Sequence, residues 1–192
     1  MFPHGRRDAL VTKAYNPLRC CPMPRILQKS ELVPGIHEIL VDAPHVAAKA
    51  RPGHFVIVMA DERGERIPLT VADYDAAAGT ITLVLMVVGT SSRKLASLAA
   101  GDELYALIGP LGHPSEIADF GTVVMVAGGV GTAPIYPIAR ALKQRGNRVI
   151  SIQGARRADL LFWHDKLAAV SDRHIITTDD GSRGRKALVT EP

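Results

Sequence analysis

The stretch Val-Ala-Gly-Gly-Val-Gly-Thr-Ala-Pro, residues 126–134, decides the fold of this chain. It begins at the end of a continuous apolar, β-branched run at 122–127, which is typical of a strand buried on both faces of a parallel sheet. A segment with helical apolar period follows at 133–144 and ends at Gly146. Glycines between a buried strand and a helix let backbone amides and the helix dipole approach a pyrophosphate. The stretch is therefore a candidate nucleotide-binding turn.

The same glycines would also suit a tight strand-to-helix turn that holds no ligand, and taken alone they leave these two interpretations about even. The Gly-x-Gly-x-x-Gly fingerprint is incomplete, since Pro134 stands where the third glycine would fall. No Gly-Lys-Ser/Thr follows, so the turn is not a P-loop. Pro134 does suit the first turn of a helix, where a missing amide hydrogen costs nothing.

Two kinds of pattern divide the chain. After the turn, a strand at 148–153, a helix at 160–170 and a strand at 174–178 complete a β-α-β-α-β unit, one half of a doubly wound sheet. Before it, short strands alternate with turn residues, and one helix is expected at 91–98, so the pattern predicts a six-stranded antiparallel β-barrel. The predicted barrel strands are 25–32, 36–41, 54–60, 66–72, 80–88 and 103–108. We expect a disordered extension at 1–24, a barrel domain at 25–115 and an incomplete α/β parallel-sheet domain at 116–192.

Composition excludes several classes of function. The chain has 192 residues, is 47% hydrophobic and 22% charged, and has no apolar run near the roughly 20 residues that cross a bilayer, so we expect a cytoplasmic protein. Most of the net charge of +4 comes from the first 24 residues, which argues against a nucleic-acid-binding stripe. Cys20 and Cys21 are adjacent, and the seven histidines lack ligand spacing, so no disulfide or metal site is predicted.

Four further motifs carry a family resemblance. They are Arg-Ile-Pro-Leu-Thr-Val-Ala-Asp at 66–73, Val-Gly-Thr-Ser-Ser-Arg-Lys-Leu at 88–95, Gly-Pro-Leu-Gly-His-Pro-Ser-Glu-Ile at 109–117 and Thr-Thr-Asp-Asp-Gly-Ser at 177–182. With the glycine turn, they resemble the ferredoxin-NADP reductase superfamily over about residues 23–192. Within it, they resemble the small subunits of NADH-dependent reduced ferredoxin:NADP oxidoreductases, also called sulfide dehydrogenase electron-transfer subunits. Dihydroorotate dehydrogenase electron-transfer subunits are close relatives. The superfamily's Arg-x-Tyr-Ser/Thr is altered, because Arg66 stands one place early and Leu69 replaces the aromatic residue.

The resemblance implies that the barrel holds FAD and the α/β domain holds NAD(H) or NADP(H). Thr70 would hydrogen-bond near the reactive flavin nitrogen N5 and is the catalytic candidate. Ser91 and Ser92 could instead cap a helix without a ligand, Asp179 could be a helix cap, and Arg156 with Arg157 could be a solvated face, which leaves the NAD or NADP preference open. The implied flavin-binding residues are Arg66, Pro68, Leu69, Thr70, Met86, Val87, Gly89, Thr90, Ser91 and Ser92. The implied nucleotide-binding residues are Gly128, Gly129, Val130, Gly131, Thr132, Arg156, Thr178, Asp179, Asp180 and Gly181.

The implied activity is hydride transfer between NAD(P)H and FAD, with electrons passed on to a larger flavoprotein or iron-sulfur subunit and indirectly to ferredoxin. The sequence is interpreted as a C-terminally truncated member of the family. A [2Fe-2S] cluster is expected only if the natural chain continues beyond Pro192. Two alternatives remain: an electron-transfer subunit of a dihydroorotate dehydrogenase, and a flavin-binding assembly fragment without turnover.

Overall fold

The structure, a computed structural model, describes residues 23–191. Of the extension predicted to be disordered at 1–24, residues 1–22 lie outside that range, whereas Pro24 accepts a hydrogen bond from the amide of Leu104. The first sheet has six antiparallel strands in the order β1-β2-β5-β4-β3-β6. Helix α1 (Pro44–Ala47) follows the second strand, and α2 (Thr90–Ser97) follows the fifth. The strands are β1 (Ile26–Val33), β2 (Ile36–Asp42), β3 (Phe55–Met59), β4 (Ile67–Asp75), β5 (Thr80–Met86) and β6 (Ala106–Leu111). The predicted barrel strands are therefore all present, with shifted ends.

The barrel closes where the start of β1 meets the segment that leads into β6. The amide of Ile26 donates to the carbonyl of Asp102 at 2.9 Å, and the amide of Leu104 donates to the carbonyl of Pro24 at 2.8 Å. Alternate residues of the strands point inward, and on β3 the inward residues Val56 and Val58 are fully buried. A single apolar core fills the interior. Catalytic or binding groups of the barrel must therefore lie on its rim or outer surface.

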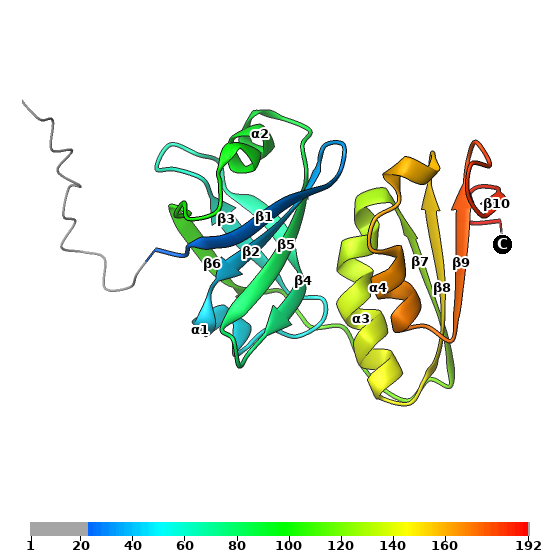
Figure 1. Cartoon of the computed structure of the whole chain (residues 1–192). Helices are drawn as coiled ribbons and strands as arrows, with labels where there is room; N and C mark the ends of the chain where they lie inside the picture. Colours follow the sequence, from blue (N-terminus) through cyan, green and yellow to red (C-terminus); the bar gives the residue numbers. More distant parts are fainter. Residues whose placement is uncertain (1–22, 192) are drawn as a thin grey trace, which may run out of the picture.

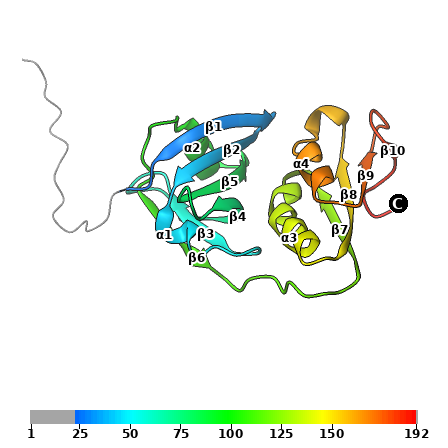
Figure 2. The same ribbon diagram turned by 60° about the horizontal axis from the view of Figure 1, so that its bottom comes forward.

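The second sheet is parallel and has the order β10-β9-β8-β7. Both of its α-helices lie on the face turned toward the barrel, between the two sheets (Figure 1). The chain reaches this sheet through an extended segment after β6, which runs along one side of the molecule (Figure 2). The elements are β7 (Thr122–Gly128), the 3-10 turn η1 (Gly129–Gly131), α3 (Thr132–Gln144), β8 (Arg148–Ala155), the 3-10 turn η2 (Ala158–Leu160), α4 (His164–Ala169), β9 (Arg173–Thr178) and β10 (Arg185–Lys186).

The helix predicted at 160–170 is wrong in its first part. The chain makes η2, then an extended step, and α4 begins only at His164. Trp163 has a left-handed backbone with φ of 54°. Neighbouring residues on a helix point about 100° apart, whereas Phe162 and Trp163 are both buried in one cluster with barrel residues. A helix could not bury both rings against the barrel, and the helix therefore begins only after them, at His164.

Two short elements were not predicted. Helix α1 has four residues and β10 has two, and both are too short to give a periodic sequence pattern. Strand β10 makes the parallel sheet four-stranded, although only three strands were expected. In the described part of the chain, no helix is long and apolar enough to span a membrane.

Candidate functional site

The glycine turn lies at the carboxyl end of β7, where the sequence predicted it. Gly128 has an extended backbone, and Gly129 has φ of +51°, a left-handed value that favours glycine. A β-carbon on Gly129 or Gly131 would meet nothing within 4 Å, so the backbone of the turn faces open space. The amides that begin α3 donate to the carbonyls of Gly129 and Val130, so the amides that lack an intrahelical acceptor are those that open η1, within the glycine turn itself. The geometry therefore fits an anionic ligand such as a pyrophosphate.

The turn is held from behind by a buried amide side chain. Gln153 on β8 is 1% exposed, and its Nε2 donates to Thr132 Oγ1 at 3.2 Å and to the carbonyl of Phe162 at 2.8 Å. Thr132 is fully buried, so its hydroxyl supports the turn from within the domain and does not face solvent. The predicted binding residue Thr132 is thus a support for the turn in this structure.

A cavity of about 520 Å³ lies in front of the turn, between the two domains. Drug-sized and cofactor-sized ligands occupy cavities of roughly 300–1,000 Å³. One wall comes from the carboxyl ends of β7, β8 and β9, where ligands bind in open α/β sheets. The other wall is apolar and comes from the barrel, namely from the β1–β2 turn and the end of β5. Its lining includes Val33, Ile36, Met86, Gly128, Gly129, Arg156 and Asp179.

The Thr-Thr-Asp-Asp-Gly-Ser motif forms a tight loop after β9. Thr178 Oγ1 donates to the carbonyl of Arg183 at 2.8 Å and accepts from its amide at 3.1 Å, so this hydroxyl closes the loop. Asp180 accepts from the amide and the hydroxyl of Ser182 at 2.9 and 2.6 Å, and these hydrogen bonds lower the pKa of its carboxyl group. Asp179 lines the cavity, and no helix begins after it within the described residues up to 191, so its predicted alternative role as a helix cap is wrong. Gly181 has φ of +77°, which the turn requires.

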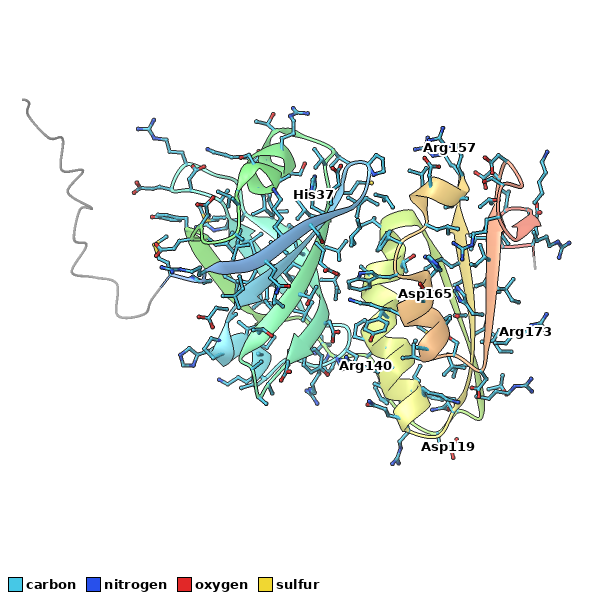
Figure 3. All side chains as sticks on the ribbon, viewed as in Figure 1. His37, Asp119, Arg140, Arg157, Asp165 and Arg173 are labelled. Carbon is cyan, nitrogen blue, oxygen red and sulfur yellow. The ribbon has the colours of Figure 1, made fainter. Side chains whose placement is uncertain are left out.

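The two arginines after β8 differ in their surroundings. Arg157 holds Asp159 through two hydrogen bonds, Nε to Oδ1 at 3.1 Å and Nη2 to Oδ2 at 2.8 Å. Arg156 lines the cavity instead. Figure 3 shows Arg157 at the end of the domain from which η2 projects. Of this pair, Arg156 alone is therefore placed to meet a ligand in the cavity.

The barrel candidates begin on β4, which pairs with β3. Thr70 is half-buried opposite Phe55, and Leu69 packs against the barrel core. Pro68 is exposed, and so is Arg66, which precedes the strand. Leu69 thus packs in the core, whereas Pro68 and Arg66 face outward at the rim, where a flat ring could lie.

The second group of barrel candidates surrounds the start of α2. Gly89 is extended, and Ser92 Oγ accepts from the amides of Val88 and Gly89, both at 2.9 Å. Ser92 is therefore the capping side chain of α2. The Ser91 hydroxyl donates to the Glu65 carboxylate, an acidic neighbour that the sequence did not predict. A phosphate at this helix start would have to displace that carboxylate.

An apolar rim lies beside the start of α2. The side chains of Met86 and Val88 are 44% and 73% exposed, although large apolar residues of this barrel are otherwise mostly buried. Exposed apolar groups next to helix amides suit a ligand with a flat ring and a phosphate, which is the chemistry of a flavin nucleotide. The residues present therefore fit FAD in type, with Glu65 as the one discordant group. Among the described residues 23–191, no group of three or more His, Cys, Asp or Glu side chains could hold a metal ion.

The sequence did not predict the contribution of the β1–β2 turn to the cavity. Val33 and Ile36 flank the dipeptide Pro34-Gly35, which looks in sequence like any hairpin turn. Gln153 was also missed, because a glutamine inside a buried strand shows its role only through its partners. No local signal marked either feature.

Comparisons with known proteins agree with this arrangement. No family model matches the chain. The chain is 43% identical, over 166 residues, to the electron-transfer subunit homologue of dihydroorotate dehydrogenase B from Thermotoga maritima, covering 86% of this chain and 58% of that protein. It is 31% identical, over 172 residues, to the electron-transfer subunit of dihydroorotate dehydrogenase B from Bacillus cereus strain Q1, covering 86% of this chain and 66% of that protein.

Among solved structures, an NADH-dependent reduced ferredoxin-NADP oxidoreductase aligns with a TM-score of 0.83 and 41% identity, covering 88% of this chain and 61% of that one. The chain thus spans about three-fifths of the length of these relatives. The alignment covers both sheets, since it takes in most of the described residues.

Proposed function

The chain belongs to the ferredoxin-NADP reductase superfamily and is homologous to dihydroorotate dehydrogenase B electron-transfer subunits, and on that premise we propose that it binds FAD and NAD(P)H and transfers electrons between them. The observation that carries the proposal is the cavity between the domains. Its glycine turn supplies amides for a nucleotide, and its opposite wall is the rim of a barrel whose outer residues suit a flavin.

Bound FAD would supply the redox chemistry, by accepting a hydride from a reduced nicotinamide and releasing the two electrons singly. Hydride transfer needs no acid or base from the protein, so the residues of this chain have to bind, orient and exclude water. In our proposal the amides at Gly129 and Gly131 hold the pyrophosphate of the nucleotide. Met86 and Val87 contact the adenosine half of the flavin, and the start of α2 meets its phosphates.

Thr70 is the residue we place at the reactive edge of the flavin. Its half-buried hydroxyl on β4 could hydrogen-bond to the flavin ring and tune its electron affinity. We expect Thr70→Val to lower the rate of flavin reduction by NADH while the FAD content stays the same. Thr80→Val, at the far end of the hairpin, is a matched control and should leave the rate unchanged. An unchanged rate in fully flavinated Thr70→Val protein would remove this role.

The partner and the location are part of the same proposal. The two curated relatives are named as electron-transfer subunits, so we propose that this chain passes electrons to a larger catalytic subunit that carries a flavin or an iron-sulfur cluster, and indirectly to ferredoxin. A cytoplasmic location remains a prediction. Which of the two related complexes the chain serves depends on that partner, and co-purification with each type of large subunit distinguishes them.

The purified protein tests the proposal directly. After incubation with FAD and gel filtration, the protein should be yellow, and anaerobic addition of NADH or NADPH should bleach it. Protein that binds FAD but is not bleached by either nucleotide would support the alternative of a flavin-binding module without turnover. Protein that stays colourless would refute both.

A further inference from the structure

One motif residue finds no place in the flavin site. Asp73 closes the Arg66–Asp73 motif, three residues beyond Thr70 on β4, yet its carboxylate points toward the other domain. Asp73 Oδ1 lies 2.6 Å from Arg140 Nη1, and Arg140 belongs to α3. Figure 3 shows Arg140 on the side of α3 that faces the barrel. The motif thus links the two domains.

The partners of Arg140 come from both domains. Its guanidinium group lies 5.6 Å from the ring centre of Tyr74 on the barrel and 5.4 Å from that of Tyr136 on its own helix. The side chains of Arg140 and Asp73 are 26% and 24% exposed. Ion pairs in the open contribute little, but this pair is half-buried, and the guanidinium also contacts two aromatic rings. The contact therefore has a defined geometry.

A second contact joins the domains a short distance away. Trp163 Nε1 donates to Glu38 Oε2 on β2 at 2.9 Å. Tyr136 connects the two contacts, because its ring packs edge-on against Trp163 at 5.5 Å. We call the five residues Glu38, Asp73, Tyr136, Arg140 and Trp163 the interdomain clamp. In the clamp, the barrel supplies both carboxylates and the α/β domain supplies both donors.

The clamp joins the two elements that carry the flavin and nucleotide candidate sites, β4 and α3. Strand β4 bears Thr70 and Asp73, whereas α3 starts at the glycine turn and bears Arg140. Eight residues separate Thr132 from Arg140, about 12 Å along a helix. The same helix therefore connects the nucleotide turn to the clamp, and a rotation of the domains about the clamp would move the turn relative to β4. When two bound reacting groups are displaced from each other by about 1 Å, the rate of their reaction can fall by up to about 10²-fold.

We propose that Arg140 and Asp73 are positioning residues that hold the domains in one orientation and thereby set the distance between nicotinamide and flavin, a role that rests on the proposed function. Neither side chain contacts the cavity in front of the glycine turn. Loss of the pair should therefore reduce the rate of electron transfer between the bound cofactors, while the affinity for each cofactor is retained.

The orientation can be measured without activity. Spin labels on Ala77→Cys and Arg173→Cys, with Cys20 and Cys21 changed to serine, report the distance between exposed sites on the two domains. We expect one narrow distance distribution in the otherwise unchanged chain and a broad or shifted one in Arg140→Met. Asp73→Asn is the milder second variant, should Arg140→Met fail to fold. A narrow, unshifted distribution in every folded variant of the pair would overturn the proposal, whatever the activity.

The rate of flavin reduction tests whether the clamp positions the two cofactors. At saturating NADH, flavin reduction in Arg140→Met and Asp73→Asn should fall at least about tenfold, with FAD content and nucleotide Kd changed less than twofold. The exchange variant Asp73→Arg/Arg140→Asp should recover most of the rate. Lys143→Gln is the matched control, since Lys143 lies on the same helix and pairs with Asp172 of its own domain at 2.6 Å. A wild-type rate in Arg140→Met would refute the positioning role, as would equal effects in Lys143→Gln. Absence of flavin reduction in the parent chain would refute the proposed function and leave the distance result standing.

Discussion

Replacing Gly184 with alanine should displace the loop after β9 and destabilise the protein. Gly184 has φ of +68°, and a β-carbon there would lie 2.1 Å from the carbonyl oxygen of Ile176, whereas real β-carbons keep at least 3.0 Å. The loop must therefore move away from β9 by close to 1 Å. Because Arg183 directly precedes Gly184, we expect this movement to break both hydrogen bonds that Thr178 Oγ1 makes with the Arg183 backbone.

The size of the effect follows from these terms. A left-handed backbone costs a residue with a β-carbon about 1–2 kcal/mol, and each of the two hydrogen bonds contributes about 1 kcal/mol. We expect Gly184→Ala to lower the free energy of unfolding by about 3 kcal/mol. Gly35→Ala is the matched control, because Gly35 has φ of +77° with nothing within 4 Å of the added carbon, and it should cost about 1 kcal/mol.

Urea unfolding followed by circular dichroism measures both variants. Titration with NADH adds a functional readout, since Asp179 in the displaced loop lines the cavity. Gly184→Ala should weaken nucleotide binding. Gly121→Ala is the reference for global destabilisation in this titration, because Gly121 has φ of +76° with nothing within 4 Å of the added carbon and lies outside the cavity. If Gly184→Ala cost no more than Gly35→Ala, the steric argument for this loop would be refuted.

Three further changes have defined outcomes. Asn147→Ala should lower the free energy of unfolding by about 3 kcal/mol, because this 2% exposed side chain makes three hydrogen bonds to backbone groups at 2.7, 2.9 and 2.9 Å; urea unfolding checks this, and a loss below that of exposed Ser97→Ala would contradict it. Lys29→Met should weaken FAD binding, because the Lys29 ammonium caps the last carbonyls of α2; flavin titration measures it, and unchanged affinity would argue against a role of α2. Burial lowers the pKa of His174 below the unfolded value of 6.5, so the unfolded chain binds more protons and stability should fall as the pH drops below about 6.5. The midpoint of urea unfolding should change more between about pH 8 and 5.5 in the wild type than in His174→Gln. Equal changes in the two proteins would show that His174 is not the source of the pH dependence.

The sequence predicted the fold wherever a local pattern carried the information. The strand at 122–127 and the helix at 133–144 were recognised because their apolar periods are unambiguous, and β7 and α3 lie there within one residue at each end. The resemblance drawn from the motifs is confirmed by the homologues. The residue-level roles in flavin and nucleotide binding stay predictions.

What the sequence could not supply depends on contacts between distant residues. Phe162 and Trp163 have helical spacing with their neighbours, but both rings are buried against the barrel, and the helix predicted there does not form. Glu65 next to Ser91 and Gln153 behind Thr132 are recognisable only when segments far apart in sequence meet. Asp73 stood inside a recognised motif, yet its partner Arg140 is 67 residues away. Local patterns therefore predict elements, and pairings between elements require the fold.

The apolar cluster at the domain boundary also bears on how the molecule unfolds. Val33, Ile36 and Val84 of the barrel are buried against Ala133, Phe162 and Trp163 of the α/β domain, so neither domain completes its own packing alone. Melting of the α/β domain would expose those barrel side chains to water, at a cost of about 25 cal/mol for each Å² uncovered. The two domains should for that reason lose their structure in one cooperative transition, and a calorimetric trace of the chain would show a single peak.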